Sequence, residues 1–594
     1  MADNSDVRKA PVVQRALLWL VTALCALPLA AREPPNIVLI VADDIGYSDL
    51  GAFGGEIRTP NIDALAGAGM RFANFHAASS CAPTRAMLLT GVDNHLAGIG
   101  SMRELMPFSH RGKPGYDGVL NERVETVASL LQSAGYRTLV AGKWHLGTSA
   151  RNLPPARGFD HSFIQADSGS DNFEMRPYLP MQAEANWYAN GERLASLPAD
   201  FYSSRAFVDE AIAFLASDTS AGAPFFAYLA FQANHTPLQA PAAFVDAYRG
   251  HYTEGWARVR EARLGRLREL GLLSAQATVA PGPSQAQWDA LPPQQQYFEA
   301  RRMQAYAGMA TAMDSEIGRF IAHLRASGEY DNTVFVLLSD NGATVAEPYD
   351  NPHGRRWLEK HYHRDVETLG ERGSWVAAGR HWGVVSNTPL AGSKFSASEG
   401  GVRVPLIIAG VPAIEPGSVY GGFVYVTDIA PTLLAIAGVE GPSADSAQRE
   451  RISGRSLLPV LAGADQPLRG ADDTIGYEFS GNAALYRGQY KLVRNQPPAG
   501  DRQWRLHNIM TDPGETQDLS QRLPDVHGAL QEAYAQYAAA AGVLPMPENY
   551  ELATQVARNA LVFVFLPRYL PYLGGALLLI AALLLAWRYR AGRA

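Results

Sequence analysis

Four short runs of apolar residues, rich in β-branched and aromatic side chains, recur along the chain: 37–42, 138–141, 225–231 and 333–338. Runs of this length that end in polar residues are typical of buried β-strands. Between them, apolar residues recur at helical spacing, as in the series Met313, Ile317, Phe320, Ile321 and Leu324. Because strands alternate with helices, the pattern predicts an α/β fold built on a sheet.

Polar side chains follow each of the four predicted strands. They are Asp43 and Asp44, Lys143 and His145, Asn234 and His235, and Asp340 and Asn341. In open α/β sheets, ligands bind at the carboxyl ends of the strands. We therefore expect the four strand ends to line one pocket.

The length of 594 residues exceeds what one simple core usually holds, so a large domain with a smaller one attached is expected. The large domain is assigned to residues 32–466. It carries a predicted surface insertion at 247–304, which is charged and helical at first and then rich in Pro and Gln. Residues 467–555 combine short strand-like pieces with an Ala-rich helix, and they are assigned to a smaller α+β subdomain.

Residues 1–31 have the pattern of an export signal. Basic residues precede an apolar run at 16–31, which ends in the small residues Ala30 and Ala31. The pattern fits a cleaved signal peptide or an uncleaved signal anchor. Both interpretations predict that the rest of the chain is exported.

Residues 570–587 form an uncharged apolar run rich in Leu and Ala. As a helix, this run would span about 27 Å, which is enough to cross the hydrocarbon core of a bilayer. Arg588, Arg590 and Arg593 follow it, and basic flanks favour the cytoplasmic side. The run is therefore predicted to be a transmembrane helix that leaves the body outside the cytoplasm. The alternative is a buried hydrophobic hairpin.

Charge and cysteine content narrow the possible functions. The net charge is -7 and the chain has no long basic stretch, which argues against nucleic acid as a partner. Of its two cysteines, Cys25 lies in the predicted export signal. If that signal is removed, Cys81 is the sole thiol in an oxidising compartment and can form no intramolecular disulfide. Such a lone cysteine calls for a chemical explanation.

Cys81 begins the sequence CAPTR, and LTG follows at 89–91. This segment resembles the CxPxR signature of type I sulfatases, in which a formylglycine-generating enzyme oxidises the cysteine to Cα-formylglycine. Further segments resemble motifs of the same family: VADDIG at 41–46, GKWHLG at 142–147, SDNG at 339–342, LHN at 506–508 and DPGE at 512–515. The resemblance covers about 36–519 and is closest to bacterial arylsulfatases. It implies an alkaline phosphatase-like fold with a large mixed, mostly parallel sheet flanked by helices.

A metal site is expected among the polar clusters. Asp43, Asp44, Asp340 and Asn341 offer only oxygen ligands, which suit a hard cation such as Ca²⁺ or Mg²⁺. The resemblance implies one Ca²⁺, with the modified Cys81 as a further ligand. Taken singly, an Asp pair or an Asp-Asn-Gly sequence is more often a turn or a helix cap.

The resemblance also implies a mechanism. The hydrated formylglycine at position 81 is a gem-diol, and one hydroxyl, deprotonated with help from Asp340 and the metal, attacks sulfur to form a covalent sulfate ester. His235 protonates the departing alcohol. The second hydroxyl then loses its proton to His145 and expels sulfate.

Three cationic side chains complete the predicted site. Arg85 is expected to hold the formylglycine hydroxyls and the metal-bound carboxylates through its planar guanidinium. Lys143 and Lys394 are expected to bind sulfate oxygens. Lysines are usually solvated and an isolated histidine such as His235 is usually structural. Their positions, at strand ends and in the polar loop 393–401, favour the functional interpretation.

The predicted substrate is a small-molecule sulfate ester. The alternatives are a phosphonate or phosphate monoester hydrolase of the same fold, and a membrane protein that binds sulfated ligands without cleaving them. The loop 349–387 carries three tryptophans, which fit either an aromatic wall for the substrate or a packed surface loop. An exported enzyme without disulfides and with a short basic tail is expected at the periplasmic face of a bacterial inner membrane.

Overall fold

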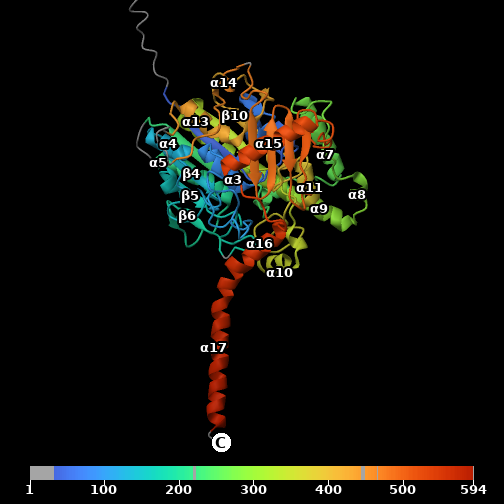
Figure 1. Ribbon diagram of the computed structural model, residues 1–594. Helices are drawn as coiled ribbons and strands as arrows, with labels where there is room; N and C mark the ends of the chain where they lie inside the picture. Colours follow the sequence, from blue (N-terminus) through green and yellow to red (C-terminus); the bar gives the residue numbers. More distant parts are fainter. Residues whose placement is uncertain (1–32, 183, 218–221, 443–448, 465, 593–594) are drawn as a thin grey trace, which may run out of the picture.

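The computed structural model describes residues 33–592 except for 183, 218–221, 443–448 and 465. The predicted export signal at 1–31 lies outside the described residues. A ten-stranded sheet with helices on both faces forms the centre of the body (Figure 1). Its strands, in spatial order, are β11 (Ser418–Tyr420), β2 (Met70–Phe72), β10 (Leu406–Ala409), β9 (Thr333–Ser339), β1 (Asn36–Ala42), β8 (Phe225–Ala230), β4 (Arg137–Lys143), β5 (His161–Gln165), β6 (Trp187–Ala189) and β7 (Glu192–Arg193).

The middle of this sheet is parallel. Five neighbouring strands run in one direction: β9, β1, β8, β4 and β5. On either side of them, β10 lies antiparallel to β9, and β6 lies antiparallel to β5. The four predicted strands are β1, β4, β8 and β9, at nearly the predicted boundaries. The prediction of an α/β fold with a large, mostly parallel sheet is confirmed.

The strand β1 shows why the central strands are apolar along their whole length. Val38, Ile40 and Ala42 pack into the hydrophobic core on one face of the sheet. Ile37, Leu39 and Val41 pack into the core on the other face. Successive side chains of a strand point to opposite faces, so a strand covered on both sides must be apolar at every position.

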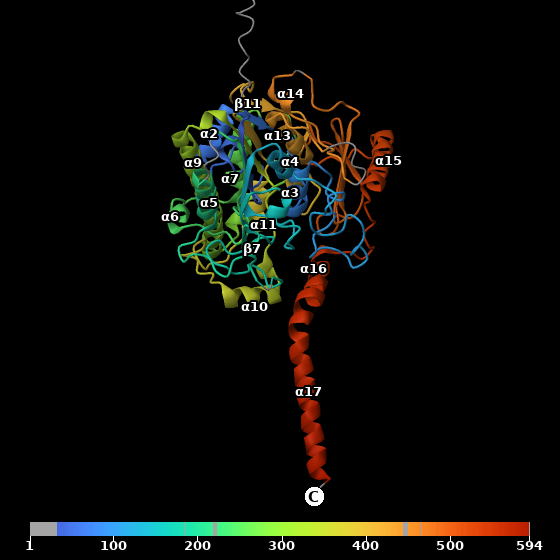
Figure 2. The ribbon, with the colours of Figure 1, turned by 90° about the vertical axis from the view of Figure 1, so that its left-hand side faces the viewer.

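Helices cover both faces (Figure 2). One core is covered by α2 (Pro60–Ala68), α5 (Ser203–Ser217), α6 (Ala242–Asp246), α7 (Trp256–Glu269), α9 (Pro293–Ser327) and α11 (Gly379–Ser386). The other is covered by α3 (Cys81–Thr90), α4 (Val127–Ser133), α12 (Glu399–Val402), α13 (Ile429–Ala437) and α14 (Leu458–Leu461). The short strands β3 (Phe75–His76) and β12 (Val424–Tyr425) pair beside the second core.

The segment 247–304, predicted as a surface insertion, lies only partly at the surface. It contains α7, the short helix α8 (Gln285–Asp289) and the first turns of α9. The helix α9 continues without a break through residue 304, and its residues from Glu299 to Met313 are almost all buried. The second half of the segment therefore belongs to the main core, and no structural boundary falls at 304.

A second, smaller sheet lies within the predicted C-terminal subdomain at 467–555. It is antiparallel and consists of β13 (Thr474–Phe479), β14 (Asn482–Arg487), β15 (Tyr490–Arg494) and β16 (Arg505–Asn508), with α15 (Pro524–Ala541) packed on one face. A buried ion pair joins it to the large domain, because Lys491 Nζ lies 2.9 Å from Glu399 Oε1.

The chain ends in a long helical segment. The helix α16 (Leu552–Ala560) continues through one turn of π-helix, η6 (Leu561–Phe565), into α17 (Leu566–Ala591), which projects away from the body (Figures 1 and 2). Among the described residues, Leu552–Ala591 is the one helical run long and apolar enough to cross a membrane, and its most apolar part is not buried. This exposure contradicts the alternative of a buried hairpin.

His95 provides a pH-dependent contact between the large domain and the C-terminal subdomain. Its Nε2 lies 2.6 Å from Glu478 Oε2 on β13, and its Nδ1 lies 3.4 Å from Asp93 Oδ1. Burial alone would lower the pKa of His95, but bonds to the Asp93 and Glu478 carboxylates outweigh it and raise this pKa to about 9. The stabilisation is therefore fully present below the unfolded pKa of about 6.5 and is lost as the pH rises through about 9.

We expect His95→Gln to lower the free energy of unfolding by about 3 kcal/mol at about pH 6, and by much less at about pH 10. Denaturant unfolding at the two pH values measures the difference. His353→Gln, on an exposed histidine, is the matched control and should change little. An equal loss at both pH values would contradict the proposed charge on His95.

Candidate active site

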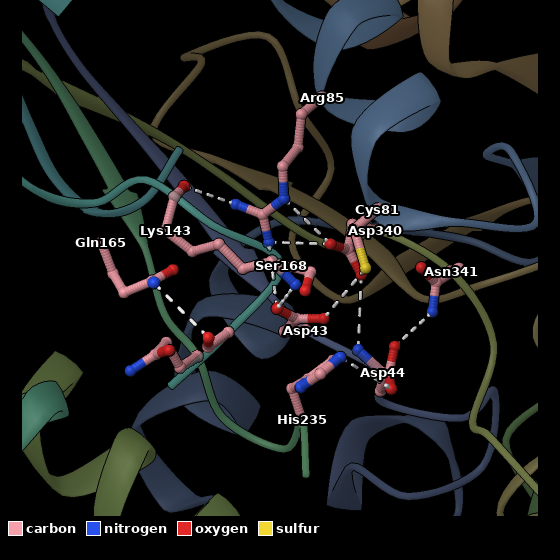
Figure 3. Close-up of polar contacts among 12 residues, drawn as sticks. Asp43, Asp44, Cys81, Arg85, Lys143, Gln165, Ser168, His235, Asp340 and Asn341 are labelled. Carbon is pink, nitrogen blue, oxygen red and sulfur yellow. Dashed lines mark hydrogen bonds and ion pairs between the residues drawn. The ribbon is translucent and has the colours of Figure 1, made fainter. Parts of the chain in front are cut away.

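Two neighbouring strand ends bring the carboxylates together. The strands β1 and β9 pair in parallel to their last residues, so Asp43 and Asp340 follow at adjacent positions. The backbone N–H of Asp44 donates to Asp340 Oδ1 at 3.3 Å, and Asn341 Nδ2 donates to Asp44 Oδ1 at 2.6 Å (Figure 3). All four side chains are buried. The first and fourth predicted strand ends therefore meet, as expected.

Cys81 is the first residue of α3 and is only 2% exposed. Its Sγ lies 3.5 Å from Asp43 Oδ1 and 3.2 Å from Lys394 Nζ. Burial, together with the charges of Asp340 and Asp43, raises the pKa of the Cys81 thiol, so the thiol is protonated at neutral pH. The free N–H groups at the start of α3 make this end of the helix favourable for an anion.

Arg85 lies one helical turn after Cys81 and is fully buried. Its Nη2 and Nε donate to Asp340 Oδ2 at 2.7 and 3.1 Å, and its Nη2 also lies 3.4 Å from Asp43 Oδ2. Its Nη1 donates to the carbonyl oxygen of Lys143 at 2.8 Å. One guanidinium therefore fixes α3 against the ends of three strands (Figure 3).

Lys143, the last residue of β4, donates from Nζ to Asp43 Oδ2 at 2.5 Å and is fully buried. The preceding residue, Gly142, has φ of 131°, and a Cβ there would lie 1.9 Å from the carbonyl oxygen of Ala230 on β8. Only glycine fits such a close approach of two strands. The glycine thus allows β4 to deliver Lys143 directly into the carboxylate cluster.

Lys394 comes from the loop between α11 and α12. Its Nζ donates to Asp44 Oδ1 at 2.6 Å, and the side chain is nearly buried. Burial alone would lower the pKa of Lys394, but the negative charge of Asp44 outweighs this effect and raises it. The ammonium group is therefore charged, and it lies 3.2 Å from Cys81 Sγ.

The two histidines differ in their contacts. His235 Nδ1 lies 2.7 Å from the carbonyl oxygen of Thr236, and its Nε2 lies 4.0 Å from Asp44 Oδ2. His145 has φ of 56° and no hydrogen-bond partner for Nδ1 among the described residues. Burial and the nearby lysine charges lower the pKa of both rings, so both are neutral in this site. A non-glycine residue with positive φ is a strained position of the kind found at functional sites.

The oxygen-rich cluster fits a hard divalent cation. Ligand atoms of Asp43, Asp44, Cys81 and His235 all lie within 4.8 Å of one another. Among the described residues, the buried Oδ1 of Asn341 has no hydrogen-bond partner, which leaves this oxygen available as a ligand. His235 is not among the ligands expected from the sequence, because no sequence pattern predicts that its Nε2 lies 4.0 Å from Asp44 Oδ2.

A cavity of about 400 Å³ reaches this site. Its wall includes Ala82 and His145, and also residues that the sequence analysis did not identify: Arg103, Glu104, Asp167, Ser168, Gln182, Val556, Asn559 and Phe563. The last three come from α16 and η6, more than 400 residues after His145 in the chain. No motif marks them, because their role depends on how the C-terminal segment docks onto the body.

The loop 349–387 is a packed surface element rather than an open aromatic wall. Trp375 and Trp382 are fully buried, and Trp357 packs against a small apolar cluster that includes Trp375. Of the two interpretations left open by the sequence, the packed loop is the one the structure supports.

Comparison with known proteins agrees with the geometry. Residues 35–439 match the family model described as Sulfatase. An uncharacterised sulfatase of Schizosaccharomyces pombe is 36% identical over 552 residues, covering 90% of this chain and 98% of the relative. The arylsulfatase of Klebsiella aerogenes is 39% identical over 435 residues, covering 73% of this chain and 91% of the relative.

The fold is also that of solved structures. The structure of Ps i-CgsB in complex with k-i-k-neocarrahexaose superposes with a TM-score of 0.61 at 24% identity, covering 90% of this chain and 99% of that protein. The family model matches more than half of the chain, and both relatives are at least 36% identical to it over most of their own length. The chain therefore belongs to the sulfatase family and is an enzyme that hydrolyses sulfate esters.

Proposed function

We propose that the protein cleaves organic sulfate monoesters to an alcohol or phenol and inorganic sulfate, with Cys81 converted to Cα-formylglycine. The observation that carries this proposal is the position of Cys81, at the start of α3 and 3.2 Å from the ammonium of Lys394. A group at this position faces the cations that an anionic sulfate needs. Both lysines and Arg85 contact the buried carboxylates, which supports this proposal.

The positive charges account for sulfate binding. Sulfate monoesters are anionic, and hydrolysis requires that the charge on the transferring group be offset. Lys143 and Lys394 are both buried, so their charges act in a medium of low dielectric constant. Lys143 pairs with Asp43 and Lys394 pairs with Asp44. We propose that each lysine also donates to a sulfate oxygen when the substrate binds.

We propose that the nucleophile comes from a modified Cys81. Its thiol is protonated at neutral pH and is therefore a poor nucleophile. A hydrated formylglycine supplies one hydroxyl for attack on sulfur and a second one whose deprotonation releases sulfate. Because Cys81 is only 2% exposed, we propose that a formylglycine-generating enzyme acts on this cysteine before the chain folds.

The remaining side chains handle protons and position the nucleophile. Arg85, bonded to Asp340 and near Asp43, is placed to orient the hydroxyls at position 81. His145 is neutral and lies at the cavity wall, so it can accept the proton of the second hydroxyl. His235 is proposed to protonate the departing alcohol, because a bound sulfate would restore its affinity for a proton.

We further propose that Asp43, Asp44, Asp340, Asn341 and the residue at position 81 hold one Ca²⁺, with Mg²⁺ as the alternative ion. Such an ion supplies positive charge that stabilises the nucleophilic oxygen and the transferring sulfate. The chemistry of the donors supports the proposal, since one buried cluster holds three carboxylates and an amide oxygen that has no hydrogen-bond partner among the described residues.

The segment 570–587, within α17, is proposed to anchor the enzyme in a membrane. Its large apolar side chains that the structure describes are exposed, an arrangement that water does not favour. The basic residues after it favour the cytoplasmic side, so the body would face the periplasm of a bacterium.

A first prediction concerns Cys81. Mass spectrometry of the tryptic peptide, from protein coexpressed with a formylglycine-generating enzyme, should show a loss of about 18 Da at this residue and release of sulfate from para-nitrophenyl sulfate. Cys81→Ala should reduce turnover by at least about a thousandfold, because it removes the nucleophile. Met87→Leu, a change of similar volume on the same helix, is the control and should retain activity.

Three results would contradict this proposal. Full activity of Cys81→Ala would exclude position 81 as the source of the nucleophile. Faster hydrolysis of an aryl phosphonate than of the matched aryl sulfate would favour the phosphonate or phosphate monoester hydrolase. An unmodified thiol without turnover, in protein that still binds sulfated ligands, would favour the non-catalytic binding protein.

A second prediction concerns the metal. Ca²⁺ at about 100 times its Kd should stabilise the protein by about 2.7 kcal/mol, seen as a higher unfolding midpoint than in chelator. Asn341→Ala should lose most of this increment. Asn351→Ala removes the N-cap of α10 (Pro352–His361), away from the cluster, and should keep the increment despite a lower baseline. Equal increments in both variants would exclude Asn341 as a ligand.

A third prediction concerns the anchor. The full-length protein should stay with the membrane pellet in alkaline carbonate, because an inserted apolar helix is not released by the loss of ionic contacts. A variant with Leu578, Ile580 and Leu584 all changed to Arg should appear in the supernatant, since each charge at the helix centre costs about 3 kcal/mol. Release of the unaltered protein would contradict a membrane-spanning α17.

A further inference from the structure

The cavity that reaches His145 is bounded by the segment that leads into α17. On that side its wall is formed by Val556, Asn559, Ala560, Phe563 and Val564, in α16 and η6. Except for Asn559, these side chains are apolar. The entrance to the active site and the start of the membrane-directed helix are thus parts of one surface.

Hydrogen bonds hold this helical wall in place. The buried Asn559 donates from Nδ2 to the carbonyl oxygens of Glu104 and Met106 at 2.8 and 3.0 Å. The buried Gln555 donates to the same Met106 oxygen at 3.2 Å. Glu104 itself lines the cavity. The position of the helix relative to the entrance is therefore fixed by hydrogen bonds to the segment that carries Glu104.

The entrance lies close to the predicted bilayer. From Phe563 to residue 570, where the uninterrupted apolar run starts, the helix rises about 10 Å. The headgroup region on each side of a bilayer is about 5–8 Å thick. Leu561 and Phe563 are about half exposed, and Tyr569 and Tyr572 follow them on the helix. Exposed aromatic side chains at this depth are typical of the membrane interface.

The same end of the body carries exposed positive charge. The helix α10 lies at the end from which α17 leaves, in both views (Figures 1 and 2). It exposes Arg355, Arg356 and Lys360. At the cavity itself, the guanidinium of Arg111 lies 3.9 Å from the centre of the Phe563 ring. Cations beside apolar side chains suit a surface that meets anionic headgroups and lipid chains together.

We propose that the substrate is a sulfated amphiphile that resides in the same bilayer as α17, and that it enters the cavity laterally from the outer leaflet. Its apolar part lies against Val556, Phe563 and Val564, and its sulfate ester points past His145 to the residue at position 81. This inference rests on the proposed sulfatase function, because it uses the same site. It goes beyond that function by naming the class of substrate and the direction of entry.

The test uses the full-length, formylglycine-bearing enzyme in phosphatidylcholine vesicles. The two probes are para-nitrophenyl sulfate in solution and a nitrophenyl sulfate carrying two hexadecyloxy chains, placed either in the enzyme's own vesicles or in separate ones. We expect the lipid probe to be hydrolysed at least about tenfold faster in the enzyme's own vesicles. Equal rates in both arrangements would contradict lateral entry.

A variant tests the apolar wall. Phe563→Ser should lower the ratio of kcat/KM for the lipid probe to kcat/KM for the soluble probe by about tenfold, which corresponds to about 1.4 kcal/mol of apolar contact. Val419→Ser, at an exposed valine on β11, is the control and should leave the ratio unchanged. An unchanged ratio in Phe563→Ser would overturn the assignment of this wall.

Hydrolysis of the soluble probe distinguishes a failure of the lateral-entry inference from a failure of the proposed sulfatase function. If para-nitrophenyl sulfate is hydrolysed but the lipid probe is not, the lateral-entry inference is wrong and the sulfatase proposal stands. If neither probe is hydrolysed by protein with confirmed formylglycine, the proposed catalytic function itself is wrong.

Discussion

The structure depends on a balance of buried charges at the carboxyl end of its central sheet. Asp43, Asp340, Arg85 and Lys143 are completely inaccessible to solvent. Each buried charge alone would cost several kcal/mol, and only close pairing with hydrogen bonds makes such groups tolerable. Arg85 is central to this balance, because it contacts both carboxylates and the backbone of β4. Folding of the sheet and assembly of the site are therefore one event.

The central sheet and the meeting of its polar strand ends could be predicted from sequence because both follow from short-range rules, whereas Arg85 and Lys394 were expected in the site only from the family resemblance. A strand such as β1, covered on both faces, must be apolar throughout, and this makes it visible as an uninterrupted run. In a parallel sheet, the residues after such runs meet at one edge. Asp43 and Asp340 are 297 positions apart, yet their proximity follows from the pairing of β1 with β9.

What could not be predicted depends on contacts between distant segments. The helix α9 appeared to begin in a surface insertion, since its first residues are polar in sequence, but packing against the main core buries Glu299 and Arg302 as an ion pair. The tryptophans of 349–387 gave no sign of whether they face a ligand or the interior. The position of the wall formed by α16 depends on hydrogen bonds from the Asn559 side chain. One asparagine in a helix is not a recognisable sequence pattern.

Those hydrogen bonds link the proposed membrane anchor to the active site. A flexible tether to an anchor would leave the active site free to point in any direction, and the membrane would then have no influence on which substrates reach it. Here the chain from Leu552 to Ala591 is helical without interruption, and α16 is bonded to the loop that carries Glu104. The orientation of the entrance is consequently coupled to the direction of α17. If α17 spans a membrane as proposed, that membrane also sets the direction from which a substrate can approach.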